Sequence, residues 1–160
     1  MDELSVHLPT DFCDRMKHNI TLQDMIKTRN LVPVSVMKQS IIKHINDNYI
    51  TIITGETGCG KSSQICQYIL DDYIGSGRGA QCNILVTQPR RLAAVSSANR
   101  VAQERLENIG DSVGYDVTTE SQLPRPYTSI LFCTVAELFQ KLEKGLRGVS
   151  HVILDEIYER

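Results

Sequence analysis

A glycine-rich stretch, GETGCGKS from Gly55 to Ser62, carries the residue types that hold phosphate groups. It fits the pattern GxxxxGK[ST], in which glycines let backbone N–H groups close around phosphate oxygens and the next helix adds the positive end of its dipole. In this pattern Lys61 reaches the β- and γ-phosphates and the Ser62 hydroxyl ligates Mg²⁺. The alternative, a chance match in a strand-to-helix turn, has a probability on the order of 1% in a chain of this length. The stretch predicts a site for ATP and Mg²⁺ that is made of Gly55, Glu56, Thr57, Gly58, Cys59, Gly60, Lys61, Ser62 and Ser63.

Two acids end an apolar run near the C-terminus. HVILDE, residues 151–156, closes with Asp155 and Glu156. Ligands of open α/β sheets bind at the carboxyl edge of the strands, so these acids fall on the edge that a phosphate loop also occupies. We therefore predict that Asp155 holds Mg²⁺ and that Glu156 orients or deprotonates a water, with Lys61 as the second catalytic residue. The alternative for an isolated acidic pair is a solvated turn, and the loop upstream argues against it.

Alternating strands and helices must position these two motifs. YITIIT, residues 49–54, is β-branched without polar alternation, which predicts a strand buried on both faces before the loop. Apolar spacing predicts a helix after the loop, over 61–74. The alternation then continues with strand NILVTQ, helix 90–109, strand VGYDV, strand SILFC, helix TVAELFQKLEKG and strand HVILDE. This order predicts an α/β fold with a mostly parallel sheet flanked by helices.

The residues before the loop show helical patterns of different strength. Val34, Met37, Ile41 and Ile45 recur at three- to four-residue spacing, which predicts a helix with one buried face. Residues 1–30 carry weaker signals, around 11–19 and 21–29. We interpret 1–30 as a loosely packed helical lead-in and 31–160 as the nucleotide-binding domain.

Bulk composition excludes several classes of protein. The 160 residues suit one domain, and 41% hydrophobic with 22% charged residues argues against disorder. A net charge of −2 argues against binding nucleic acid by bulk charge. The five cysteines include no CxxC pair, so a zinc module or disulfide framework is not expected. Since no apolar run approaches a membrane span, we expect no membrane contact and a location in the nucleus or cytoplasm.

Four motifs, in this order, resemble motifs I, Ia, Ib and II of DEAH/RHA-type (DExH-box) superfamily 2 helicases. They are GETGCGKS, TQPRR (87–91), LFCTVAEL around Thr134, and DEIYER (155–160). The intervening segments, such as QYILDDYI and KLEKGLRGVSHVILDE, are similar in particular to the RNA helicase A/maleless group. The resemblance runs from about Leu31 to Arg160. It implies the first RecA-like domain of an ATP-driven RNA translocase, with Arg90, Arg91 and Thr134 on the RNA backbone.

The residues themselves support RNA contact in part. From Gln88 to Leu106, Arg90, Arg91, Arg100 and Arg105 stand against a single acid, Glu104. Phosphate contacts fit such a locally basic segment, and a solvated helix face is the alternative reading. No residues favour sequence-specific base reading, so we expect strong salt dependence and little base preference.

Three departures from the family pattern limit the expected activity. Tyr158 replaces the usual His of motif II, and Thr118–Thr119 replaces a common Arg-Phe. The Ser-Ala-Thr motif, the second domain and the arginine finger are not in these 160 residues. In the family the Ser-Ala-Thr strand lies between the phosphate-loop and DExH strands, so we expect a nonstandard pairing or unpaired backbone groups there. A supplied arginine contributes roughly 10³- to 10⁵-fold, so we expect the chain alone to hydrolyse ATP very slowly.

Three hypotheses follow from these observations. The first is an ATP-dependent RNA helicase, represented by its first RecA-like domain as a truncated piece. The second is a noncatalytic module derived from a helicase, which holds nucleotide or RNA, or docks on a helicase, without unwinding; helicase-associated proteins are possible partners in either case. The third is an unrelated P-loop enzyme such as a small-molecule kinase, which the matches to motifs Ia and Ib argue against.

Overall fold

A five-stranded sheet forms the centre of the computed structural model, which describes residues 20–157. The strand order is β3-β2-β4-β1-β5, and every neighbouring pair is parallel except the β2–β3 hairpin. The strands are β1 (Asn83–Gln88), β2 (Val113–Val117), β3 (Glu120–Gln122), β4 (Ser129–Thr134) and β5 (His151–Leu154). The predicted α/β class with a mostly parallel sheet is confirmed. The helix predicted around 11–19 and the substituted Tyr158 lie outside the described residues.

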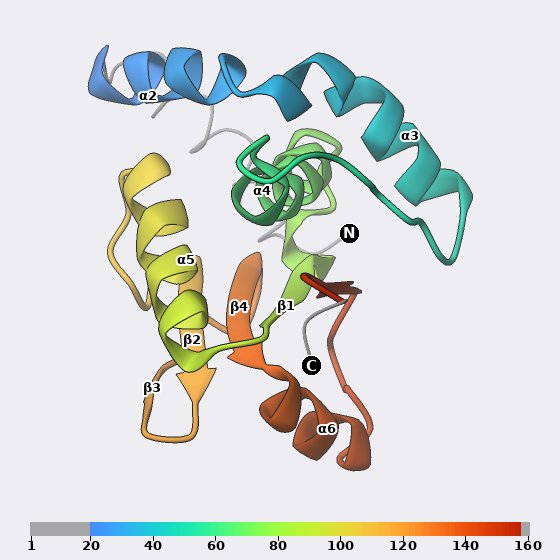
Figure 1. The fold of residues 1–160 in the computed structure, drawn as a ribbon, viewed down its shortest axis with the longest axis vertical. Coiled ribbons are helices and arrows are strands. Elements are labelled where there is room, and N and C mark those ends of the chain that lie inside the picture. Colours follow the sequence, from blue (N-terminus) through green and yellow to red (C-terminus); the bar gives the residue numbers. More distant parts are fainter. Residues whose placement is uncertain (1–19, 158–160) are drawn as a thin grey trace.

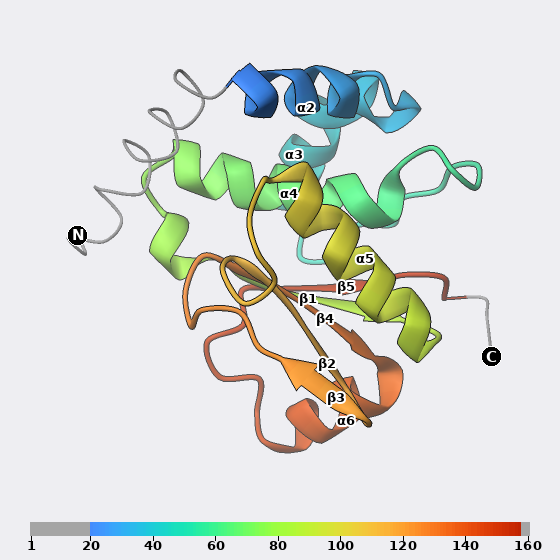
Figure 2. The ribbon, with the colours of Figure 1, turned by 90° about the vertical axis from the view of Figure 1, so that its left-hand side faces the viewer.

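Helices cover both faces of this sheet (Figures 1 and 2). Side chains of α4 and α5 pack on one face, α6 packs on the other, and α2 and α3 lie over α4. No helix in the range 20–157 is long and apolar enough to cross a bilayer. The helical elements are α2 (Ile20–Asn30), η1 (Pro33–Met37), α3 (Lys38–Asp47), α4 (Lys61–Gly75), η2 (Gly79–Gln81), α5 (Arg91–Glu104) and α6 (Val135–Glu143).

The central strands are apolar over most of their length because both of their faces are covered. In β1, Ile84 and Val86 pack with α4 and α5, whereas Leu85 packs on the opposite side with Leu138 of α6. Successive side chains of a strand point to opposite faces, so a strand between two helix layers is apolar on both faces through its centre. This explains why the runs NILVTQ and SILFC were correctly predicted as strands.

One predicted strand is wrong. Residues 49–54, YITIIT, form no strand, and Ile50 and Ile52 are 84% and 80% exposed. Ile53 is the member of this run that packs against the core. The physical reason is the order of the sheet, which ends at β5, so that among residues 20–157 no strand lies beside 49–54 to share backbone hydrogen bonds. Within the described residues, β5 pairs with β1 alone, and its outer edge is open.

Two further differences concern the end of a helix and a short additional strand. The helix predicted over 90–109 stops at Glu104, because Leu106 adopts a left-handed φ of 51° and Arg105 turns into the interior. The strand β3, which was not predicted, is short and exposed, so it lacks the apolar pattern that identifies buried strands.

Candidate nucleotide site

The phosphate loop and the acidic strand end lie at the same edge of the domain. β1, β4 and β5 run parallel, so their carboxyl ends share one edge of the sheet. Figure 2 shows the loop before α4 and the end of β5 on the same side of the molecule. The segments that carry motifs I, Ia, Ib and II therefore lie on the same side of the molecule, where the parallel strands end.

Two glycines give the phosphate loop its shape. Gly58 and Gly60 have φ of 82° and 99°, in the region that glycine adopts without strain. A Cβ at Gly60 would lie 3.2 Å from Cγ1 of Val34 and 3.4 Å from Cγ of Gln64. The Val34 N–H also donates to the carbonyl of Cys59 (3.0 Å), so η1 anchors the loop from behind. This packing leaves residues 55–58 exposed for a ligand at the start of α4.

Lys61 folds back onto its own loop. Its Nζ donates to the carbonyls of Gly55 (2.6 Å) and Glu56 (2.8 Å) and lies 3.5 Å from Sγ of Cys59. The ammonium thus stands among the loop residues, where phosphate oxygens can compete for its donors. The loop with its left-handed glycines and this cation fits a bound triphosphate.

Asp155 is oriented by a neighbour from motif Ia. The amide Nε2 of Gln88 donates to Asp155 Oδ2 at 2.8 Å, and Oδ1 accepts the N–H of Glu156 at 3.1 Å. Glu156 itself has φ of 52°. This role of Gln88 is not predictable from its place in TQPRR, because a neutral amide gives no signal of a carboxylate partner. Within 20–157 there is no cluster of three or more His, Cys, Asp or Glu side chains suited to a metal.

The side chains predicted to contact RNA differ in exposure. Arg90 and Arg91 are exposed at the start of α5. Thr134 is 8% exposed, and its hydroxyl donates to Glu137 in the first turn of α6. Glu137 also accepts from the Thr118 hydroxyl (2.6 Å). Burial would raise the pKa of Glu137, but these hydrogen bonds outweigh it and lower the pKa.

The basic character predicted for 88–106 is partly wrong. Arg105 is buried and forms an ion pair with Asp71 of α4 (2.9 Å), so its charge does not face solvent. Arg100 Nε lies 3.0 Å from Oε1 of Glu104 one helical turn later. The number of charges is plain from the sequence. Which guanidinium groups form ion pairs with carboxylates of the same domain is not.

Comparisons with known proteins place the chain in a group. No protein-family model matches it. It is 44% identical over 161 positions to the mouse "ATP-dependent DNA/RNA helicase DHX36", covering 98% of this chain and 16% of the relative. It is 46% identical over 140 positions to the Arabidopsis thaliana "DExH-box ATP-dependent RNA helicase DExH3", covering 86% of this chain and 12% of the relative.

A third relative extends the similarity to another member. The chain is 48% identical over 131 positions to the chicken "ATP-dependent RNA helicase DHX30", covering 81% of this chain and 11% of the relative. The chain thus spans 11–16% of the length of these three relatives. The match covers the segment with the phosphate loop and the acidic strand end described above. By its sequence similarity to these relatives, the chain belongs to the DExH-box helicase group, and its α/β fold with a mostly parallel sheet is consistent with that.

Proposed function

We propose that this chain binds ATP with Mg²⁺ and acts as the first RecA-like domain of an ATP-dependent RNA helicase. The observation that supports the proposal is that the loop GETGCGKS leads directly into α4 and lies on the same side of the molecule as the end of β5, which Asp155 and Glu156 follow (Figure 2). The names of the relatives, which are ATP-dependent RNA or DNA/RNA helicases, support it.

Each residue has a distinct role in this proposal. The loop from Gly55 to Ser63 surrounds the phosphates with backbone N–H groups, and Lys61 adds a cation. Ser62 and Asp155 would hold Mg²⁺, and Gln88 fixes the carboxylate of Asp155 for that role. Mg²⁺, when bound, neutralises charge on the phosphates. Glu156 accepts a proton from an attacking water or orients it.

RNA contact is proposed for the same edge of the domain. Arg90 and Arg91 are exposed where β1 passes into α5, and the N-terminus of α6 follows Thr134. Backbone phosphates suit these groups better than bases, because arginine forks and helix N-termini bind anions. We further propose a nuclear or cytoplasmic location and contact with helicase-associated proteins, in keeping with an RNA substrate.

A second candidate is a noncatalytic module that holds nucleotide or RNA. The observation that favours it is the position of residues 49–54, which lie outside the sheet and leave the phosphate loop without a supporting strand on its N-terminal side. Binding would survive such an arrangement, since α4 and η1 still support the loop. Hydrolysis, which needs the loop and Glu156 in a fixed relation, is the more sensitive property.

Hydrolysis of radiolabelled ATP, with and without single-stranded RNA, separates the two candidates. The helicase proposal expects RNA-stimulated hydrolysis from the intact helicase that contains this domain, and its loss in Glu156→Gln while ATP binding is retained; the 160-residue chain alone should bind ATP and hydrolyse it very slowly. An intact protein that binds an ATP analogue without RNA-stimulated hydrolysis would favour the noncatalytic module. Absence of both binding and hydrolysis would overturn both candidates.

A further inference from the structure

The first turn of α4 is held from behind by a buried amide. Gln64 is fully buried, although glutamine normally lies on the surface. Its Nε2 donates to Oε2 of Glu104 on α5 (2.8 Å) and to Oγ of Ser63 (3.1 Å). Its Oε1 accepts from Nε of Arg29 on α2 (3.1 Å). Two other helices therefore bind one side chain located three residues after Lys61.

Glu104 is the centre of this cluster. The same oxygen, Oε2, also accepts from Nε2 of Gln67 (2.8 Å), which in turn donates to the carbonyl of Ser63 (2.8 Å). Both the side chain and the carbonyl of Ser63 are thus engaged from the interior. A single carboxylate oxygen on α5 accepts hydrogen bonds from two buried amides of α4.

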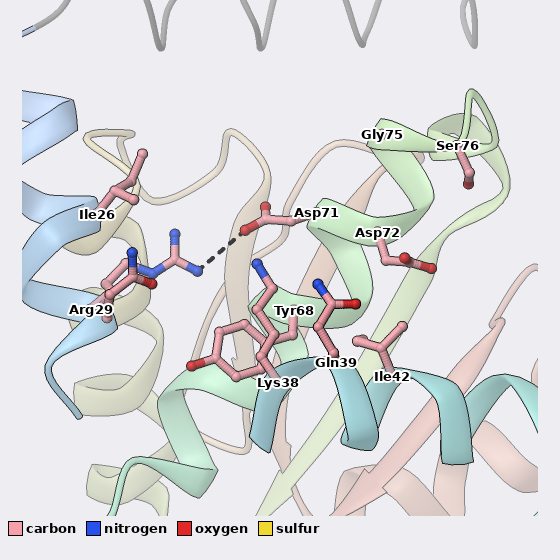
Figure 3. Close-up of a pocket in the computed structure, with 11 residues that line it drawn as sticks. Ile26, Arg29, Lys38, Gln39, Ile42, Tyr68, Asp71, Asp72, Gly75 and Ser76 are labelled. Atoms are coloured by element: carbon pink, nitrogen blue, oxygen red, sulfur yellow. Dashed lines mark hydrogen bonds and ion pairs between the residues drawn. The ribbon is translucent and has the colours of Figure 1, made fainter. Parts of the chain in front are cut away.

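A pair of buried ion contacts lies one helical turn farther along α4. Asp71 contacts Arg29 of α2 (3.2 Å), the pair drawn in Figure 3, and Arg105 after α5 (2.9 Å). Burial would raise the pKa of Asp71, but the charges of Arg105 and Arg29 outweigh it and lower the pKa. Apolar side chains would hold helices together at a smaller desolvation cost. Such a cluster does define one orientation, because its hydrogen bonds are directional.

The cluster touches the phosphate loop directly through Gln64. The N–H of Gln64 donates to the carbonyl of Gly60 (2.9 Å), which closes the first turn. A Cβ at Gly60 would lie 3.4 Å from Cγ of Gln64, so the loop backbone rests close to this side chain. A displacement of Gln64 must therefore move Gly60 and the N–H groups beside it.

We propose that Glu104 and Gln64 are positioning residues for nucleotide binding: the contact between them fixes α4 so that the N–H groups of the phosphate loop meet the phosphates. The proposal rests on the proposed function of the loop. Glu104 is the last residue of α5, and the next residue, Arg105, is buried. Glu104 itself does not contact the phosphate loop. Its effect on affinity must pass through Gln64 and Gln67, the two amides that it holds.

The test measures the dissociation constant of a fluorescent ATP analogue with Mg²⁺, together with the melting temperature of each variant. Glu104→Ala removes one of the two acceptors of each of the buried amides of Gln64 and Gln67, so we expect affinity to fall by about tenfold, with a lower melting temperature. Gln64→Glu sets a second carboxylate against Glu104 and should weaken affinity in the same way. Adding Glu104→Gln to Gln64→Glu restores an amide–carboxylate pair with donor and acceptor exchanged, and we expect it to recover affinity.

The matched control is Ser129→Ala. Ser129 is buried at the amino end of β4, where its hydroxyl donates to Asn83 Oδ1 (2.9 Å). We expect this variant to lower the melting temperature and to keep the wild-type affinity for the analogue.

The outcomes separate the inference from the function beneath it. Wild-type affinity in folded Glu104→Ala or Gln64→Glu would overturn the positioning role and leave the proposed function intact. If Glu104→Ala does not fold, the exchange pair decides: failure of the double variant to regain affinity while folded would overturn the inference. A wild-type chain that binds no analogue would overturn the proposed function itself.

Discussion

The two halves of the candidate nucleotide site are built differently. The phosphate loop leads into α4, which is buried at residues 63–70 and held by side chains of α2 and α5. The acidic half lies on β5, an edge strand that pairs only with β1 within the described residues and exposes Val152 (41%) and Leu154 (56%). The phosphate-loop half is held by side-chain contacts from two other helices. The acidic half is held by the backbone hydrogen bonds between β5 and β1 and by the contact of Gln88 with Asp155. We expect affinity to follow the α4 side and hydrolysis to follow the β5 side.

The strongest test of the α4 side removes the carboxylate of Asp71, whose side chain is 14% exposed and whose two arginine partners are buried. Asp71→Asn leaves the guanidinium groups of Arg29 and Arg105 without their shared anion. Breaking a buried pair in this way costs about 3–5 kcal/mol, so we expect a large fall in the free energy of unfolding. Urea denaturation measures it. A cost below about 1 kcal/mol, typical of surface pairs, would show that these charges contribute little.

The β5 side is tested through Gln88→Ala. Without the 2.8 Å contact from Gln88 Nε2, the Asp155 carboxylate loses the partner that orients it toward a metal. Outer partners of metal ligands are worth about 10–100-fold in metal affinity or activity, so we expect the hydrolysis rate to fall by that factor. Affinity for ATP should change little. The control is Gln103→Ala, on the exposed face of α5, and an equal loss in both variants would contradict the role of Gln88.

The stability of the fold should depend on pH through one carboxylate on α4 and another on α6. The pKa values of Asp71 and Glu137 are lowered in the fold. A lowered pKa adds stability above the unfolded value, near pH 4, and this stability is lost as pH falls through the folded value. We expect the urea concentration at the midpoint of unfolding to decrease once the pH falls below about 4. Glu137→Gln, measured from pH 7 to pH 3, should flatten part of this drop, and an unchanged pH profile would contradict it.

The smallest effect is expected at the open edge. Val152→Thr replaces a methyl group by a hydroxyl on a side chain that is 41% exposed. Surface changes of this kind usually stay within about 0.5 kcal/mol. Urea denaturation would check this, with Leu70→Ala in the fully buried part of α4 as the contrast at about 2–5 kcal/mol. A cost at Val152 close to that of Leu70 would show that the β5 edge is covered in solution.

The sequence predicted the strands and the loop well where the deciding information is local. NILVTQ and SILFC are largely apolar because helices cover both faces of these strands, and HVIL shows the same apolar run although Val152 and Leu154 are exposed at the sheet edge. YITIIT has the same composition and forms no strand, because a strand needs a neighbour and the neighbour is not written in its own residues.

The polar contacts behind the loop were beyond the reach of sequence reasoning. Gln64 and Glu104 look like ordinary polar positions of helices, and Arg105 looks like a solvated basic group. Their burial depends on how α4 and α5 cross, which periodicity does not specify. The Gly60 signal was strong because a left-handed φ and close packing both demand glycine at that position.

The most direct test of the account is a titration of a fluorescent ATP analogue with Mg²⁺ into the wild-type chain, Lys61→Ala and Lys27→Ala. Lys27 is an exposed lysine on α2 that pairs with Asp24, so it controls for the loss of a positive charge. Loss of the hydrogen bond from the Lys61 ammonium to phosphate should weaken binding about 10–100-fold. We predict that loss in Lys61→Ala and wild-type affinity in Lys27→Ala. Equal affinity in wild type and Lys61→Ala would contradict the assignment of GETGCGKS as the nucleotide site.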